Sequence, residues 1–333
     1  MRDSPSFCAI DAFRDAARRA FLARCDRWAH SRIDLLPVDA SFRRYFRLTK
    51  GSETALLMDA PPNKENPGDF VRIARHLAGL GLRAPSVHCF DAREGFAIIE
   101  DFGDDTFTKL LDAGADPKPL YEVAIDVLTA LHRHPQATAI DLPPYDHGPL
   151  LDEAVLLPDW YYPEQRGCPC PASLRDEYLK AWRKATGFLL TACDTLVLRD
   201  YHVDNLMRVG YGEGIRSCGL LDFQDACIGH RAYDVMSLLE DARYDVPQAL
   251  QEAMLDRYLA AFPELDRNGF VDAYTVLAAQ RHCKVAGIFV RLFRRDGKAQ
   301  YLRHIPRVID MLRRNLDHPR LSHIKGWVRL NLG

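Results

Sequence analysis

Three residues of the chain have types and spacing that suit the transfer of a phosphoryl group. Asp200 and Asn205 lie in the stretch LRDYHVDN at 198–205, and Asp222 lies in LLDFQ at 220–224. A carboxylate and an amide oxygen are hard ligands that suit Mg²⁺, which also keeps several of its waters. If Asn205 and Asp222 hold that ion, Asp200 remains available as the base for an alcohol. The order of the three residues therefore predicts magnesium-dependent phosphoryl transfer.

The segment between these residues predicts a β-hairpin. Two short apolar runs, 206–209 and 218–221, flank the glycine-rich segment 210–214 and have the pattern of antiparallel strands. Folding of the hairpin would bring Asp222 close to Asn205. The alternative is that the two aspartates only cap turns, which Asp does commonly. The ordered set with a hairpin between its halves favours the catalytic interpretation.

The same stretches resemble the aminoglycoside phosphotransferase family, small-molecule kinases that share the protein-kinase fold. Further similarity lies in ALH at 130–132, DW at 159–160 and YDV at 233–235. The chain is most similar to the bacterial anomeric N-acetylmuramate/N-acetylglucosamine kinases of cell-wall recycling. The stretches that carry this resemblance are DASFRRYFR at 39–47, LMDAPP at 57–62, DYH at 200–202, DFQDA at 222–226 and GIF at 287–289.

The resemblance implies an α+β, protein-kinase-like bilobal fold. Residues 1–102 would form a nucleotide-binding lobe with a five-stranded antiparallel sheet and a helix, and residues 103–333 a mainly helical catalytic and substrate-binding lobe. The implied activity is ATP-dependent phosphorylation of the anomeric hydroxyl of an amino sugar, with ATP and Mg²⁺ as cofactors. Two alternatives stay open: a kinase of another small alcohol, of the aminoglycoside, choline or amino-acid type, or a non-catalytic nucleotide-binding module.

The resemblance also implies which residues bind the nucleotide. The turn over the phosphates contains no glycine, so it would act through backbone amides and through Ser41, Phe42, Arg43 and Arg44. Lys64 either reaches the phosphates or is a solvated loop lysine. Met58 occupies the strand position at which many relatives carry a phosphate-binding lysine or arginine. Adenine would lie against the segment from Glu100 to Phe102, where the first lobe ends.

Substrate contacts are expected at five residues, namely Trp160, Tyr161, His202, Gln224 and Asp225. The first two lie in a segment predicted to be irregular, 158–171. For His202 the alternative is a packed, hydrogen-bonded ring, and for Gln224 and Asp225 it is a polar surface role. Asp234 is expected to hydrogen-bond to the backbone of the catalytic loop, as its counterpart does in kinase-like folds.

Periodicity predicts the elements that position these residues. Period-two patterns indicate strands at 42–48, 54–59, 86–91 and 96–101. Apolar residues spaced three and four apart indicate helices, and a further irregular segment is expected at 143–149. The predicted helices are 11–30, 69–80, 120–133, 174–191, 247–261, 270–294 and 306–316.

Composition narrows the function classes. With 44 basic against 46 acidic residues in a chain of 333, nucleic acid is not an expected partner. No apolar run approaches the ~18 residues that cross a bilayer, and no signal peptide is recognised, so we expect a cytoplasmic protein without membrane insertion. Its expected partner is the amino sugar alone, bound by a monomer. The nine cysteines are expected to be reduced, with Cys168 and Cys170 as the one tight pair that could donate to zinc.

The C-terminal part of the chain is strongly basic. Residues 281–333 contain 13 Lys and Arg but 3 Asp and Glu. One interpretation is a solvated basic face of the last helices. The other is a field that attracts an anionic substrate, or a membrane surface that carries such substrates.

Overall fold

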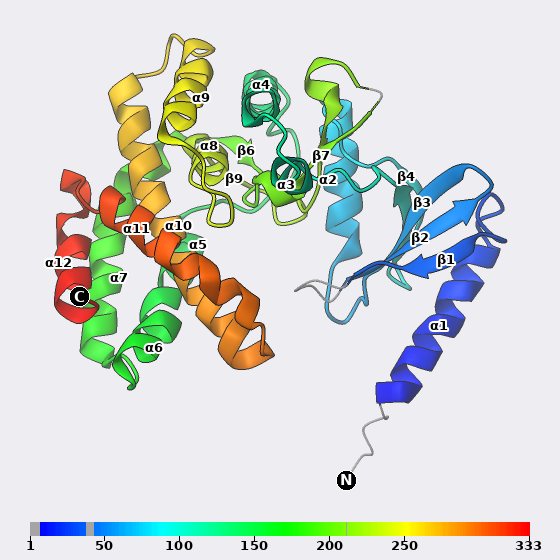
Figure 1. Ribbon diagram of the computed structural model, residues 1–333, viewed down its shortest axis with the longest axis horizontal. Helices are drawn as coiled ribbons and strands as arrows, with labels where there is room; N and C mark the ends of the chain where they lie inside the picture. Colours follow the sequence, from blue (N-terminus) through cyan, green and yellow to red (C-terminus); the bar gives the residue numbers. More distant parts are fainter. Residues whose placement is uncertain (1–6, 38–42, 211) are drawn as a thin grey trace. The chain divides into compact units, whose positions relative to one another are not determined.

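The computed structural model of the protein describes residues 7–37, 43–210 and 212–333, with side chains from Arg14 onward. These residues form two compact units (Figure 1). Unit 1 comprises the described residues up to 105 together with 207–224. Unit 2 comprises 106–206 and 225–333. Unit 1 contains a five-stranded antiparallel sheet with helices and unit 2 is mainly helical, which confirms the predicted α+β fold class.

The sheet of unit 1 has the strand order β1-β2-β3-β5-β4. Neighbouring strands are antiparallel, and β2 to β5 correspond to the four strands predicted from period-two patterns. The edge strand β1 was not predicted, because its four residues are all exposed and give no alternating signal. The bounds are Arg32–Leu35 for β1, Arg44–Lys50 for β2, Glu53–Asp59 for β3, Val87–Asp91 for β4 and Phe96–Glu100 for β5.

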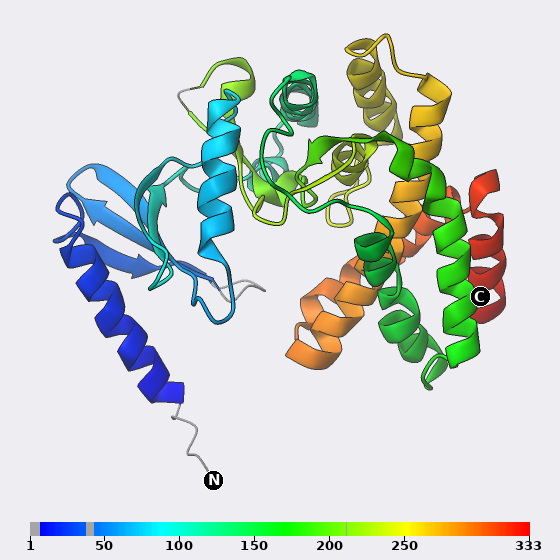
Figure 2. The same cartoon turned by 180° about the vertical axis from the view of Figure 1, so that it is seen from behind.

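Two helices, α1 (Phe7–Ala23) and α2 (Pro67–Gly79), lie on different sides of this sheet (Figures 1 and 2). The α1 side is closed by a cluster in which Trp28 packs with Phe46 and Phe96. The predicted helix 11–30 ends earlier than expected, at Ala23, and the chain then turns so that Trp28 enters this cluster. α2 begins where the Asn66 side chain accepts from the Gly68 amide, as in a normal N-cap.

The predicted hairpin is present as β7 (Leu206–Arg208) paired with β8 (Cys218–Leu220). A 3₁₀ turn, Gly214–Ser217, precedes β8. The hairpin is attached to unit 1, because the Leu220 amide donates to the Arg83 carbonyl at 2.8 Å. Gly219 allows the Phe102 ring to lie against the hairpin, since a Cβ at 219 would come within 2.7 Å of that ring.

The longest helix of unit 2 is α10 (Arg267–Asp296), which is labelled in Figure 1. Most of its residues are buried. Two strands, β6 (Cys193–Val197) and β9 (Cys227–His230), form an antiparallel pair. The remaining α-helices are α3 Phe107–Asp112, α4 Pro117–Arg133, α5 His147–Ala154, α6 Tyr162–Arg166, α7 Ala172–Thr186, α8 Ala232–Leu239, α9 Gln248–Ala260, α11 Ile305–Asn315 and α12 Ser322–Asn331. Shorter turns are Gly187–Ala192, Val203–Asn205, Ala299–His304 and Pro319–Leu321.

The prediction of irregular structure in unit 2 was partly wrong. A π-helical segment, η1 (Leu157–Tyr161), continues directly into α6, so 158–166 is helical. Pro158 is tolerated there because a proline in the first turn loses no required amide bond. The segment 143–149 likewise contains the start of α5, where the Asp146 side chain accepts from the Gly148 amide. Among the described residues, no helix is both long enough and apolar enough to span a bilayer.

Candidate active site

Asp200 follows β6 in a tight and strained turn. Arg199 has φ 70°, and the Asp200 amide donates to the Leu198 carbonyl at 2.9 Å. This is a γ-turn with positive φ, a rare conformation that persists only where neighbouring groups enforce it. Asp234 of α8 does so by accepting from the Leu198 amide at 2.6 Å and from the Arg199 amide at 2.9 Å. The predicted role of Asp234 is confirmed.

The Asp200 side chain is anionic and partly accessible. Its Oδ1 accepts from Nη2 of Arg281 at 3.2 Å, and 34% of the side chain is exposed. Burial acts to raise the pKa of this carboxyl, but the positive charges of Lys284 and Arg281 outweigh burial and hold the pKa below its usual range. Asp200 is therefore a carboxylate at neutral pH and can accept a proton.

Asn205 and His202 complete the loop after Asp200. The Asn205 side-chain nitrogen donates to the Asp200 carbonyl at 2.9 Å, and its backbone amide donates to the His202 carbonyl at 2.9 Å. This contact uses the nitrogen of the Asn205 side-chain amide, and the other polar atom of that group is a carbonyl oxygen. Such an oxygen is a ligand that fits Mg²⁺.

His202 is a packed residue, with 5% of its surface exposed. Burial, reinforced by the positive charge of Arg243, lowers the pKa of His202 well below its usual value, so the ring is neutral. Its Nε2 lies 3.4 Å from the Asn205 side-chain nitrogen and 3.3 Å from Nη1 of Arg243. These contacts match the packed, hydrogen-bonded alternative for His202. Contact with a substrate stays a prediction.

A network of buried charges surrounds the turn, and the sequence did not predict it. Glu153 of α5, which is 8% exposed, accepts from Lys284 Nζ at 2.8 Å and also bonds to Arg199 and Tyr145. Burial acts to raise the pKa of Glu153, but Lys284 and Arg199 outweigh it and lower the pKa. With Arg281, Asp200 and Asp234, the network contains three cationic side chains and three carboxyl groups, and burial raises the pKa of Asp234 to about 7. Near neutral pH the network therefore carries no net negative charge.

The network changes the interpretation of the basic C-terminal stretch. Arg281 and Lys284, its first two cations, are 6% and 7% exposed and are paired with carboxylates. A wholly solvated basic face was therefore the wrong expectation for this end of the stretch. Others, such as Arg294 with its exposed pairing to Glu164, do lie at the surface.

Asp222 lies in unit 1, two residues beyond β8. It has φ 55°, a left-handed conformation that Asp tolerates better than most residues. The Gln224 side-chain nitrogen donates to Asp222 Oδ1 at 2.8 Å, and the intervening Phe223 ring stacks on Phe70 of α2 at 5.1 Å. Asp222 is exposed on this anchored turn. Gln224 therefore supports the Asp222 carboxylate, a role that the sequence did not predict.

The predicted phosphate turn is described in part. Ser41 and Phe42 lie outside the described residues. Arg43 is 8% exposed and donates to Glu65 at 2.8 Å, so its charge is partnered within unit 1. Burial raises the pKa of Tyr45, with Arg43 opposing this effect and Asp222 adding to it. Arg43 and Asp222 thus both act electrostatically on the same tyrosine.

The other predicted nucleotide-binding residues are spread over unit 1. Arg44 lies on β2, half-buried, and Lys64 is exposed in the turn before α2. Met58 on β3 is fully buried and brings no charge. The Glu100 carboxylate pairs with Arg83, whose guanidinium lies 5.1 Å from the Phe102 ring. Glu100 therefore holds the end of β5 in place.

The predicted substrate residues of unit 2 differ in accessibility. Trp160 is half-buried and Tyr161 is 8% exposed, both within η1. Helix α10 contacts this segment closely, since a Cβ at Gly287 would come within 2.2 Å of the Leu156 carbonyl oxygen. Asp225 is exposed, and its carbonyl accepts from Arg199 at 3.4 Å. In unit 2, this hydrogen bond connects Asp225 to the turn that holds Asp200.

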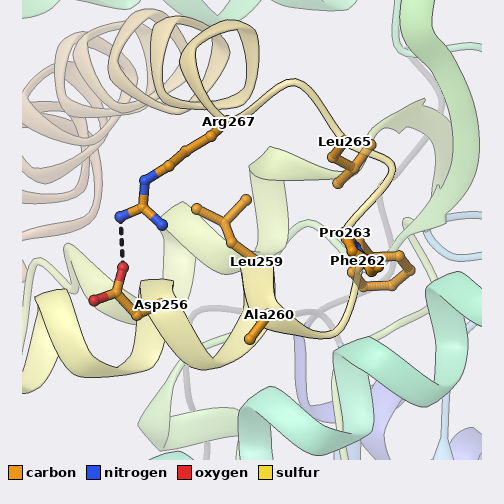
Figure 3. A pocket seen from close by; sticks show the side chains of 7 residues that line it. All are labelled: Asp256, Leu259, Ala260, Phe262, Pro263, Leu265 and Arg267. Carbon is orange, nitrogen blue, oxygen red and sulfur yellow. Dashed lines mark hydrogen bonds and ion pairs between the residues drawn. The ribbon is translucent and has the colours of Figure 1, made fainter.

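Two hollows of unit 2 lie away from these residues. One, of about 500 Å³, is formed where α9 ends and α10 begins, and Arg267 pairs with Asp256 at its side (Figure 3). The other, of about 600 Å³, is lined by residues of 239–255 together with Tyr274, Met311 and Arg314. No predicted site residue lines either hollow. Among the residues that the structure covers, no group of three or more His, Cys, Asp or Glu could hold a metal ion.

Comparison with known proteins identifies relatives over most of the chain. The model of the phosphotransferase enzyme family matches residues 32–274. A curated N-acetylmuramate/N-acetylglucosamine kinase of Caulobacter vibrioides is 35% identical, over 96% of this chain and 96% of that protein. One from Pseudomonas aeruginosa is 37% identical, over 82% of this chain and 81% of that protein.

Solved structures with similar folds are more distant in sequence. A choline kinase from Streptococcus pneumoniae has a TM-score of 0.63 at 12% identity, covering 89% of this chain and 99% of that chain. A putative aminoglycoside phosphotransferase from Ralstonia eutropha has a TM-score of 0.62 at 14% identity, covering 91% and 97%. At these identities the likeness establishes the fold.

Proposed function

The chain belongs to the phosphotransferase enzyme family, and on this premise we propose that it is an ATP-dependent amino-sugar kinase. It phosphorylates the anomeric hydroxyl of N-acetylmuramate and of N-acetylglucosamine. Curated relatives that match most of this chain carry the name N-acetylmuramate/N-acetylglucosamine kinase, which supports this substrate class. The observation that carries the proposal is the ionised, partly exposed Asp200 carboxylate, held on a strained turn after β6.

Asp200 acts as the base of the reaction. It accepts the proton of the sugar hydroxyl as the hydroxyl oxygen attacks the γ-phosphorus of ATP. Asn205 and Asp222 would hold Mg²⁺, which neutralises charge on the phosphates. Pairing of β7 with β8 supports this assignment, because Asn205 directly precedes one strand and Asp222 closely follows the other.

The electrostatics of Asp200 favour an acidic acceptor. Because Lys284 and Arg281 lower its pKa, Asp200 is a weaker base than an ordinary aspartate. A weak base is best matched to a hydroxyl that releases its proton readily, and the anomeric hydroxyl is the most acidic hydroxyl of a sugar. The buried network around Asp200 also has no net negative charge, whereas a polycationic aminoglycoside would prefer acidic surroundings.

Nucleotide and phosphate contacts complete the proposal. Arg43, Arg44 and Lys64 of unit 1, with Ser41 and Phe42, bind the phosphates of ATP, and adenine lies against the segment from Glu100 to Phe102. Trp160, Tyr161, His202, Gln224 and Asp225 contact the sugar. The protein acts as a cytoplasmic monomer in peptidoglycan recycling, where ATP and the released sugars meet.

A product assay tests this function. The purified protein is incubated with ATP, Mg²⁺ and a panel of N-acetylmuramate, N-acetylglucosamine, choline and an aminoglycoside, and the products are analysed by ³¹P NMR. We expect a sugar 1-phosphate from both amino sugars. Asp200→Asn is the matched control, and its kcat should fall at least ~10²-fold, the usual contribution of a general base. A 6-phosphate product, or turnover with the aminoglycoside alone, would overturn the substrate assignment.

A further inference from the structure

Arg281 contacts the base and the turn that carries it. From α10, its Nη1 donates to the Arg199 carbonyl at 3.0 Å and its Nη2 donates to Asp200 Oδ1 at 3.2 Å. Nη1 also donates to the Tyr233 hydroxyl at 3.0 Å. One planar guanidinium thus spans a backbone oxygen and the carboxylate of neighbouring residues, a geometry that arginine alone provides.

The carbonyl that Arg281 contacts belongs to the strained residue. Arg199 is the residue at φ 70°, and its carbonyl oxygen also accepts from the Ser237 hydroxyl at 3.3 Å. Asp234 holds the amides on the other side of the same turn. Arg281 differs from both of these groups because it also reaches the reactive carboxylate.

The contact with Arg281 gives the two carboxylate oxygens of Asp200 different hydrogen-bonding surroundings. Oδ1 accepts from the guanidinium, whereas Oδ2 has no hydrogen-bond partner within the described part of the chain. A carboxylate fixed through one oxygen cannot rotate freely about its terminal bond, so the other oxygen is presented in one direction. Holding a reacting group in a fixed orientation can raise the reaction rate by large factors.

We propose that Arg281 is a positioning residue that clamps Oδ1 of Asp200 and the strained Arg199 peptide together, so that Oδ2 receives the proton of the acceptor. The inference rests on the proposed role of Asp200 as base. It assigns a role in the reaction to a buried residue of the C-terminal basic stretch.

A double-mutant cycle tests the clamp. The variants are Arg281→Met, Asp200→Asn and the two combined, measured for kcat and for KM of sugar and ATP with radiolabelled ATP. We expect Arg281→Met to lower kcat about 10- to 100-fold while both KM values change less than about threefold. In the Asp200→Asn background it should lower kcat less than about threefold, because the clamp acts through Asp200.

Arg281→Lys separates charge from geometry. Lysine keeps the positive charge but cannot hold two oxygens in one plane, so kcat should fall less than in Arg281→Met and remain below wild type. Arg257→Met is the matched control, since Arg257 makes a bidentate pair with Asp126 at the surface, at 2.7 and 2.8 Å. That variant should keep the kcat of the wild type.

The outcomes distinguish this inference from the proposed function. If Asp200→Asn keeps wild-type turnover, the base assignment fails and the clamp fails with it. If Asp200→Asn loses activity but Arg281→Met keeps wild-type kcat, the clamp alone is refuted. An equal loss from Arg281→Met in both backgrounds would also refute it, because a merely structural residue acts independently of Asp200. If Arg281→Met does not fold, Arg281→Lys replaces it in the double-mutant cycle. A wild-type kcat of Arg281→Lys then overturns the proposal.

Discussion

Replacing Glu153 with glutamine should destabilise unit 2 strongly, although the change removes one charge and no volume. Glu153 accepts from Lys284 at 2.8 Å and bonds to Arg199 and Tyr145 while 8% exposed. Removing one partner of a buried pair typically costs about 3–5 kcal/mol. The amide oxygen of glutamine still accepts from Lys284, and the Arg199 side chain is 24% exposed and can turn to water. We therefore expect a loss of about 2–3 kcal/mol in the free energy of unfolding.

Urea unfolding in a Trp28→Phe background measures this loss. Three tryptophans then remain, at 160, 182 and 327, and all belong to unit 2. Glu164→Gln is the control, since Glu164 pairs with Arg294 at the surface and exposed pairs contribute about 0–1 kcal/mol. If the two variants unfolded at the same urea concentration, the buried network would contribute no net stability and the reasoning would be wrong.

The destabilisation should also depend on pH. Lys284 and Arg199 hold the folded pKa of Glu153 below its usual value against the effect of burial. A lowered folded pKa contributes stability that is present above the unfolded pKa, about 4.3, and is lost as the pH falls through the folded value. The difference between wild type and Glu153→Gln should therefore be constant near neutral pH and shrink below about pH 4.3.

Two further outcomes are expected. Asp222→Ala should abolish turnover without unfolding unit 1, and EDTA should abolish wild-type turnover until Mg²⁺ is restored; both effects are measured by steady-state kinetics. Asp317→Ala is the control, because Asp317 is exposed. Full activity in EDTA without added metal would contradict the metal assignment. Gly287→Ala should lower the free energy of unfolding by about 1–3 kcal/mol, and the urea midpoint with it, because its Cβ would overlap the Leu156 carbonyl at 2.2 Å. Gly326→Ala in α12 is the control, since its Cβ would meet open space and should not destabilise; equal midpoints for the two variants would refute the close contact.

The sequence predicted the elements with strong periodicity and the residues within one short motif. The paired strands β2 and β3 and the hairpin β7-β8 were predicted because alternation and turn residues are local signals. η1 and α6 were not, because Pro158 and Pro163 read as helix breakers although each lies in a first helical turn. Propensity is local, whereas these segments gain their stability from burial of residues such as Leu157.

The predicted site omitted the residues that support Asp200 from elsewhere in the chain. Glu153 and Lys284 lie 131 positions apart, and no local pattern joins them. One signal was present: Gln280, Arg281, His282 and Lys284 interrupt an otherwise largely apolar stretch of the helix, 276–290. Charged residues inside a buried helix need partners, so this run indicated a buried network. The sequence could not say which carboxylates would be those partners.

Because the hairpin is attached to unit 1, this unit is completed late in synthesis and cannot be produced as one continuous fragment. The chain passes between the units after residues 105, 206 and 224, so neither unit is a continuous segment that could be cut out at one peptide bond. During synthesis, residues 106–206 leave the ribosome before unit 1 has received its last strand. A fragment that ended at residue 105 would lack the strand that bonds to Arg83 and the ring that stacks on Phe70.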